Sequence, residues 1–376
     1  MDVHFNARKI KYNTLRHICE PITQSSNIKT VNVFINLDDI YHKLHRPGVN
    51  EEFQMIGDNA YKQLIMNILN LIAHYRQGFV RLGCKTRVIC FYTNVFNGSF
   101  RNSLYVREYR KHYFDITRPQ NDSYFFINKA FHSVSNLLSA ICDRIDGVYA
   151  INTMFIEPSV IPLYLATNRL EADWNFIISK DLYDLQYALH ERWSFIWPNG
   201  DESMIVYDNG IWDFISYKEK MIPKPPVSNF SPKWFPIAYS VIGDRYRNIE
   251  KIKRTGWRSL FAYLQQAEEM TRGMSEITSV YTMVQVLRGK HSTEEMIEKN
   301  LLTVDIDRQL NRLSEIDRTA IDQQIIDAPD YGNLQELARM YFLRYPINIQ
   351  FLTDNNPENN GYNRFGKPVN PFGNIG

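Results

Sequence analysis

Short apolar runs, rich in β-branched and aromatic residues, recur through the first half of the chain. Three of them, at residues 31–35, 87–92 and 175–178, are continuous enough to predict strands that are buried on both faces. Apolar residues return every three or four positions in 59–75 and in 131–145, which predicts helices packed along one side. Strands that alternate with helices of this length are typical of an α/β fold with a parallel sheet.

The same patterning continues further along the chain and then changes. A third helix is predicted at 158–166, and two apolar runs at 193–196 and 204–207 flank the turn sequence Pro198-Asn199-Gly200-Asp201. Such a turn between two runs predicts a β-hairpin. Residues 220–236 contain five prolines, which break the pattern and indicate a linker into a more helical C-terminal half.

We therefore expect five segments in the chain. They are an N-terminal extension at 1–30, the α/β core at 31–219, the proline-rich linker at 220–236, a helical C-terminal region at 237–353 and a tail at 354–376. The tail is rich in Asn, Gly and Pro, so by composition it cannot bury enough apolar surface to fold alone. A protein partner is predicted for it.

Composition narrows the class of protein. Lys plus Arg is 43 and Asp plus Glu is 41, so the net charge is 43 − 41 = +2, which excludes a polyelectrolyte and requires any nucleic-acid contact to use a local basic patch. The four cysteines form no CxxC pair, which argues against a zinc ribbon or a disulfide scaffold. We expect neither a signal peptide nor a membrane span, because no apolar run is long enough.

One segment joins a glycine-bearing turn to a group of cations. It begins Gly243-Asp244-Arg245-Tyr246-Arg247-Asn248-Ile249 and continues with Lys251, Lys253, Arg254 and Arg258. Backbone amides of a turn and cations of a following helix can both contact phosphate, so the pattern favours a grip on a DNA backbone. A basic, solvated helix face explains the same pattern equally well.

A second segment gives the first one a context. Ser179-Lys180-Asp181 follows a predicted strand, and Gln186 comes five residues later. Together the two segments resemble the flap endonuclease and 5′→3′ exonuclease superfamily, particularly its phage-type RNase H branch. In that family a strand ends in Ser-x-Asp-x-Asp-x-x-Gln, and a later Gly-Asp-x-x-Asp-Asn-Ile opens a helix–three-turn–helix.

Further partial matches follow in the family's order, so the resemblance spans roughly residues 30 to 350. Residues 33–36 fall where the first strand delivers its Asp, and Glu157 falls where a Glu-Ala-Asp-Asp motif opens a helix. Residues 300–305 resemble a late segment of the phage branch. The resemblance implies a PIN-like parallel sheet with flanking helices, followed by a helical region with a helix–three-turn–helix.

The family cleaves phosphodiesters with two divalent metals, held by about seven or eight carboxylates. By this alignment three of the acids remain, namely Glu157, Asp181 and Asp244. Six ligand positions are replaced, by Asn36, Asn94, Ser159, Val160, Tyr183 and Arg247. Val carries no ligand atom and Arg repels a cation, so the sequence predicts that two-metal hydrolysis is lost.

Two alternatives keep a metal in the site. Four acids lie near the expected ligand positions and could restore a ligand through a register slip: Asp38, Asp39, Asp173 and Asp184. Alternatively, the three remaining acids hold a single Mg²⁺ or Mn²⁺. If neither alternative holds, no cofactor is expected.

A second basic stretch falls where relatives carry an arch that threads single strands. Its cations are Arg101, Arg107, Arg110 and Lys111. Tyr105, Tyr109 and Tyr113 are interleaved with them and could stack on bases. The alternative is an amphipathic helix with a solvated face.

Three functions remain open from the sequence. The first is a pseudonuclease that binds nucleic acid without turnover, with DNA favoured over RNA. The second is a structural component of a virion or polymerase-like complex. The third is an active 5′ nuclease that uses Mg²⁺ or Mn²⁺. The phage-type resemblance implies the cytoplasm of an infected bacterium, or a virion, as the setting. The sequence contains no HExxH, Walker or GxGxxG pattern.

Overall fold

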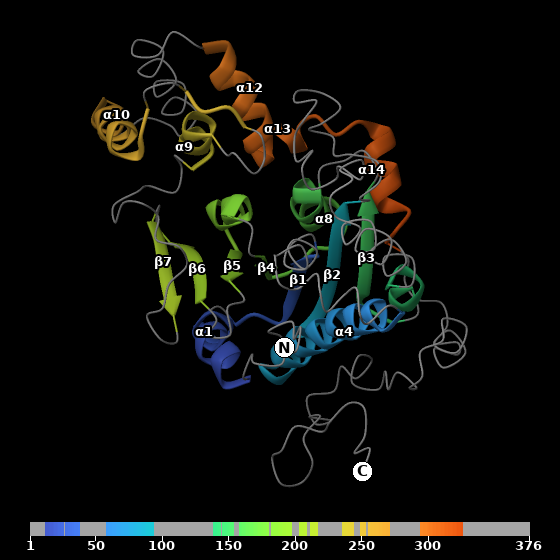
Figure 1. The fold of residues 1–376 in the computed structure, drawn as a ribbon. Helices are drawn as coiled ribbons and strands as arrows, with labels where there is room; N and C mark the ends of the chain where they lie inside the picture. Colours follow the sequence, from blue (N-terminus) through green and yellow to red (C-terminus); the bar gives the residue numbers. More distant parts are fainter. Residues whose placement is uncertain are drawn as a thin grey trace.

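A computed structural model of the chain describes residues 12–25, 27–37, 58–93, 138–143, 145–153, 158–179, 182–197, 203–208, 211–216, 235–243, 249–252, 255–270 and 294–325. Its centre is a seven-stranded sheet in the order β3-β2-β1-β4-β5-β6-β7 (Figure 1). The strands are β1 (Thr30–Asn36), β2 (Lys85–Thr93), β3 (Val148–Thr153), β4 (Trp174–Ile178), β5 (Trp193–Trp197), β6 (Ser203–Asp208) and β7 (Ile211–Ser216).

Five neighbouring strands of the sheet run parallel. The pairs β3–β2, β2–β1, β1–β4 and β4–β5 are all parallel, whereas β6 and β7 extend the sheet in antiparallel fashion. The predicted strands correspond to β1, β2 and β4, and the predicted hairpin corresponds to β5 and β6. The α/β class with a parallel sheet is confirmed, while β3 and β7 were not predicted.

Helices flank the sheet on both faces and continue beyond it. They are α1 (Tyr12–Ser25), α4 (Asp58–Arg81), η2 (Pro158–Val160), α8 (Ile161–Asn168), η3 (Leu182–Leu189), α9 (Phe235–Ile242), α10 (Trp257–Met270), α12 (Glu294–Val304), α13 (Ile306–Leu310) and α14 (Glu315–Asp322). The prediction at 59–75 lies within α4, and the prediction at 158–166 corresponds to η2 and α8. Of the predicted helix at 131–145, the structure describes only the last part, and residues 138–142 are helical.

The two faces of the sheet carry two separate apolar clusters. Alternate side chains of β1 divide between them, because Val33 and Ile35 pack with α1 and α4, whereas Phe34 packs with α8 and η3. All four cysteines are free and buried, as expected of a chain without a disulfide scaffold. Burial raises the pKa of the Cys84 thiol to about 11.

The helix α1 lies within residues 12–25, in the segment predicted as an N-terminal extension. Its Leu15 and Cys19 are fully buried in the cluster that α4 also lines. A Cβ atom added at Gly78 of α4 would lie 2.2 Å from Leu15 Cδ2, so the absence of a side chain there allows the two helices to meet. The first helix is therefore integral to the core.

The helices α9, α10, α12 and α13 gather at the top of the view in Figure 1. The helices α9, α10 and α12 share a small apolar cluster that includes Ile237, Leu260 and Leu301, whereas Ile306 of α13 belongs to the cluster on the sheet. The helix α9 begins at Phe235, inside the last residues of the predicted linker, and the predicted tail lies outside the described residues. None of the helices in the described ranges is long and apolar enough to cross a membrane.

Candidate functional site

Two polar residues of the candidate site, Asn36 and Ser179, lie at the carboxyl ends of two central strands. Strand β1 ends at Asn36, and Ser179 follows directly after the end of β4. The strands are parallel neighbours, with Ile35 opposite Ile178, so both side chains lie at the same edge of the sheet. Open parallel sheets bind ligands at this edge, where the connections leave the strands.

A third side chain, Asp184 on η3, completes this group. Its Oδ2 atom accepts a hydrogen bond from Asn36 Nδ2 at 2.6 Å and another from Ser179 Oγ at 2.6 Å. All three residues are buried, with exposed fractions of 6% for Asn36, 1% for Ser179 and 1% for Asp184. A buried carboxylate requires such donors, and bonds to a charged acceptor are short and strong. We call Asn36, Ser179 and Asp184 the edge triad.

Three other replaced ligand positions, Ser159, Val160 and Tyr183, are also described, and each takes part in packing. Ser159 and Val160 are buried in η2, where the Ser159 carbonyl oxygen accepts a hydrogen bond from the Tyr187 hydroxyl and Val160 joins the core. The fully buried start of α8 therefore depends on these positions as structural residues. Neither the Val160 side chain nor an engaged Ser159 carbonyl supplies an anionic ligand.

Tyr183 of η3 packs against two aromatic residues of α9. Its ring lies edge-on to Phe235 with centroids 6.4 Å apart and tilted against Tyr239 with centroids 5.2 Å apart. Ile249 and Val304 complete this cluster, and Tyr183 is only 2% exposed. At position 183, where the sequence resemblance predicted a replaced carboxylate, the structure has an aromatic ring that joins η3 to the C-terminal helices.

The remaining proposed metal positions lie outside the described residues. These are the three retained acids Glu157, Asp181 and Asp244 and the replaced positions Asn94 and Arg247. Within the described ranges, no group of three or more His, Cys, Asp or Glu side chains could hold a metal ion. The described part of this edge supplies one carboxylate, whose Oδ2 already accepts from two donors, together with a neutral amide and a hydroxyl; a single anion of this kind does not fit a hard dication, which prefers several.

Asp173 was one of four acids considered as substitute ligands, and the structure shows that this prediction is wrong. Its Oδ2 atom accepts hydrogen bonds from the backbone amides of Lys29 and Thr30 at 2.9 and 2.8 Å, at the amino end of β1. These bonds lower the pKa of Asp173 and hold it at the edge opposite to Asn36. Asp38 and Asp39 lie outside the described residues, so among these acids only Asp184 is observed at the site.

Gln186 connects the site to the C-terminal helices. Its Nε2 donates to the carbonyl oxygens of Tyr183 at 3.0 Å and Val304 at 2.9 Å, and its Oε1 accepts from the Ile306 amide at 3.3 Å. Val304 ends α12 and Ile306 begins α13, so a single buried amide satisfies a carbonyl at one helix end and an amide at the next. Gln186, the last residue of the Ser-x-Asp-x-Asp-x-x-Gln pattern, thus has a structural role in this chain.

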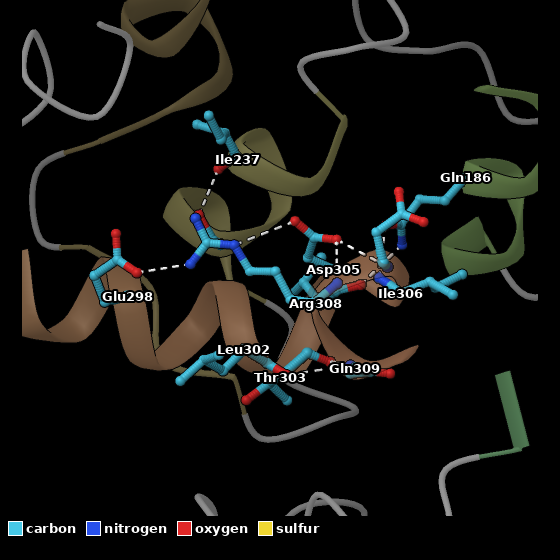
Figure 2. Close-up of polar contacts among 12 residues, drawn as sticks. Gln186, Ile237, Glu298, Leu302, Thr303, Asp305, Ile306, Arg308 and Gln309 are labelled. Carbon is cyan, nitrogen blue, oxygen red and sulfur yellow. Dashed lines mark hydrogen bonds and ion pairs between the residues drawn. The ribbon is translucent and has the colours of Figure 1, made fainter. Parts of the chain in front are cut away.

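A charged group lies next to this junction. Figure 2 shows the Arg308 guanidinium between two carboxylates: Glu298 at 2.7 Å and Asp305 at 3.5 Å. Asp305 is the N-cap of α13, and its Oδ1 accepts from the amides of Asp307 and Arg308 at 3.0 and 3.2 Å. Burial outweighs these contacts and raises the pKa of Asp305 to about 6.

The segment between α9 and α10 folds back tightly on itself. Gly243 has φ +71°, and a Cβ atom there would lie 2.6 Å from the Ile249 carbonyl oxygen and 2.7 Å from the Lys251 amide. Ile252 donates to the Val241 carbonyl at 3.0 Å, and Asn300 Nδ2 donates to the carbonyls of Ser240 and Glu250 at 2.7 and 2.8 Å. Only glycine permits this approach of two backbones.

The described chain places one of the eight cations predicted to bind nucleic acid. Lys251 is exposed beside the Gly243 turn. Arg258 lies on α10, but its side chain is outside the described set. The remaining six lie outside the described residues: Arg101, Arg107, Arg110, Lys111, Lys253 and Arg254. Their roles stay predictions.

Sequence reasoning missed the main feature of the edge, the pairing of Asn36 with Asp184. The available signal was an acid between two otherwise buried residues, Tyr183 and Leu185, in a segment expected at the site. An acid in such surroundings needs a donor nearby, and Asn36 at the end of the neighbouring strand was the available one.

Comparison with models of known protein families finds no match, and comparison with curated protein sequences also finds none. Solved structures do match. The chain is similar to the D15 flap endonuclease of bacteriophage T5 in a complex with DNA and metal ions, at 13% identity and a TM-score of 0.50. It is also similar to T5 D15 protein crystallised with metal ions, at 13% identity and a TM-score of 0.52. Each comparison covers 82% of this chain and 99% of that one. The flap endonuclease and 5′→3′ exonuclease fold, which the sequence resemblance predicted, is confirmed.

Proposed function

We propose that this chain binds DNA through a 5′-nuclease fold without hydrolysing it. The observation that carries the proposal is the edge triad, because the one described carboxylate at this edge, Asp184, is bound by Asn36 and Ser179. Two further ligand positions, Val160 and Tyr183, are committed to packing. A phosphodiester cut by the two-metal route needs several free oxygen anions, and these positions supply none.

The binding half of the proposal rests on the α9–α10 region. We infer that α9, the segment 243–256 and α10 form a helix–three-turn–helix that contacts the DNA backbone. The close approach at Gly243 fixes the turn and leaves Lys251 exposed beside it. Cations on a fixed turn bind phosphates without reading sequence, so the expected affinity is strongly salt-dependent. Similarity to a flap endonuclease solved in a DNA complex supports DNA binding by this fold.

A second candidate is an active metal-dependent 5′ nuclease. The fold is that of the T5 flap endonuclease, which was solved with metal ions, and Glu157, Asp181 and Asp244 remain in the sequence. These three acids could hold one Mg²⁺ or Mn²⁺. In that case cleavage would depend on the metal and would disappear in Asp181→Ala.

A native gel with labelled 5′-flap DNA, run with Mn²⁺ and with chelator, separates the two. We expect a shifted, intact band in both lanes. Cutting in the Mn²⁺ lane alone, abolished by Asp181→Ala, would refute the proposal and establish the enzyme. Neither a shift nor a cut would also refute it and would favour a scaffold role, with the tail at 354–376 as the place to seek a protein partner.

A matched pair of lysine variants locates the surface. Lys251→Ala removes an exposed cation beside Gly243. Lys85→Ala removes an exposed cation at the amino end of β2, which is the edge of the sheet opposite to the edge triad. Losing one phosphate contact should weaken binding and reduce the slope of log affinity against log salt by about 1 for Lys251→Ala only. Equal effects of the two substitutions would place the DNA elsewhere.

A further inference from the structure

We propose that the hydrogen bond between Asn36 and Asp184 prevents divalent cations from binding at the carboxyl end of β1. A carboxylate at position 36 would instead create a cation site together with Asp184. This inference rests on the proposed function and names the residues that keep the metal out. It concerns a pair that the family pattern does not contain, since that pattern places no required acid at position 184.

The geometry shows why a cation is excluded. Asn36 Nδ2 and Ser179 Oγ both donate to the same oxygen, Asp184 Oδ2, each at 2.6 Å. A carboxylate oxygen has two lone pairs in the plane of the group, and these two donors use both. Because all three residues are buried, the network is also shielded from water that could replace either donor. A metal ligated by Oδ2 would have to break both hydrogen bonds, and a metal ligated by the other oxygen, Oδ1, would gain no second anion from Asn36 or Ser179.

The side chain at position 36 determines whether the metal-free or the metal-bound site is the more stable one. Asp and Asn have the same shape, but an aspartate offers an acceptor where Asn36 offers a donor. In Asn36→Asp the 2.6 Å contact would join two carboxylate oxygens in a buried place. Two such carboxylates can both stay charged only with a cation between them; without one, they share a proton and carry a single charge. Two carboxylates and the Ser179 hydroxyl are oxygen ligands of the kind that Mg²⁺ and Mn²⁺ prefer.

The test compares four proteins: wild type, Asn36→Asp, Asp184→Asn, and the exchange variant that carries both substitutions. The exchange variant keeps one amide and one carboxylate at the same two places, so it controls for packing. Thermal unfolding is measured in chelator and in Mn²⁺ at pH 7, and Mn²⁺ binding is followed by electron paramagnetic resonance. Neither readout depends on DNA or on cleavage.

We expect the wild type and the exchange variant to unfold at the same temperature with and without Mn²⁺. Asn36→Asp should unfold about 5 °C or more lower in chelator and recover in Mn²⁺, with one additional bound ion. If Asn36→Asp does not fold in chelator, recovery of folding in Mn²⁺ is the same positive result. Failure to recover in Mn²⁺, while the exchange variant folds normally, would overturn the inference.

A second result would also overturn it. If Mn²⁺ stabilises the wild type and Asp184→Asn removes that effect, Asp184 is already a metal ligand and the pair does not exclude the cation. A stabilisation that persists in Asp184→Asn instead arises from other acids and counts against the proposed function alone. The additional response of Asn36→Asp then still decides the present inference, so the two failures are distinguishable.

Discussion

Gln186 makes the hydrogen bonds that join η3 to the junction of α12 and α13, so Gln186→Leu should weaken this connection. Gln186 is 3% exposed, and its amide binds the carbonyl of Val304 and the amide of Ile306. Leucine has a similar size but cannot bind either group. Two polar backbone groups at adjoining helix ends would then be buried without their partner.

The magnitude follows from this count. Each buried backbone group left unpaired costs about 1–3 kcal/mol, so the two together should reduce the free energy of unfolding by about 2–6 kcal/mol. Extra apolar burial by leucine offsets less than about 1 kcal/mol of this. Gln309→Leu is a matched control, because buried Gln309 also donates to carbonyls at the end of α12 but makes these bonds within the α12–α13 region.

Urea unfolding and hydrogen exchange provide the readouts. Both variants should lower the unfolding midpoint. Only Gln186→Leu should accelerate exchange at the Ile306 amide, because that amide donates to Gln186. Unchanged exchange at Ile306 together with a loss of stability below about 0.5 kcal/mol would refute the account of Gln186 as the link between the two regions.

Two further predictions concern the same C-terminal region. The pKa of Asp305 rises from 3.8 to about 6, so its contribution to stability is fully present below pH 3.8 and is lost as the pH rises through about 6. Asp305→Asn keeps the capping oxygen and should remove this pH dependence, which is worth up to about 3 kcal/mol. Urea unfolding of both proteins at pH 4.5 and 7 measures the effect. A difference in stability between the two proteins that does not vary with pH would contradict the prediction. Gly243→Ala should destabilise the protein by at least about 2 kcal/mol and weaken DNA binding, because its Cβ would meet backbone atoms at 2.6–2.8 Å. Gly256→Ala, where a Cβ meets nothing within 4 Å, is the control. Gly256 directly precedes α10, where alanine is a poorer cap than glycine, so this variant should cost no more than about 1 kcal/mol; a cost equal to that of Gly243→Ala would show that backbone crowding is not the cause.

Hydrophobic periodicity predicted the strands that are buried on both faces, because these form continuous apolar runs. The central strands β1, β2 and β4 were found in this way. In β7 the run is interrupted by Asp213. Strand β3 does contain the apolar run 148–151, so the same reasoning could have found it, and it was missed. The order of strands in the sheet also could not be read, since periodicity gives the type of an element but not its neighbour.

The acids around β4 show what strand direction adds to sequence reasoning. Asp173 precedes the strand and Asp184 follows it, so in a parallel sheet they belong at opposite edges. This argument was available from the sequence once the sheet was predicted as parallel, and it excludes Asp173 as a ligand. The path of η3, which returns the Asp184 carboxylate to Ser179 five residues earlier, was not available, because no local pattern predicts an eight-residue 3-10 segment.

The replaced ligand positions differ in what their reversal would cost, and this difference isolates position 36. A carboxylate at Val160, the N-cap of α8, would replace an apolar side chain of the core cluster by a buried charge and remove its packing there. A carboxylate at Tyr183 would remove the ring that packs against Phe235 and Tyr239 and would leave a cavity between η3 and α9. Asn36→Asp changes no volume and places its new charge beside Asp184. Of these three, it is therefore the substitution in which metal binding can be gained without first losing the fold.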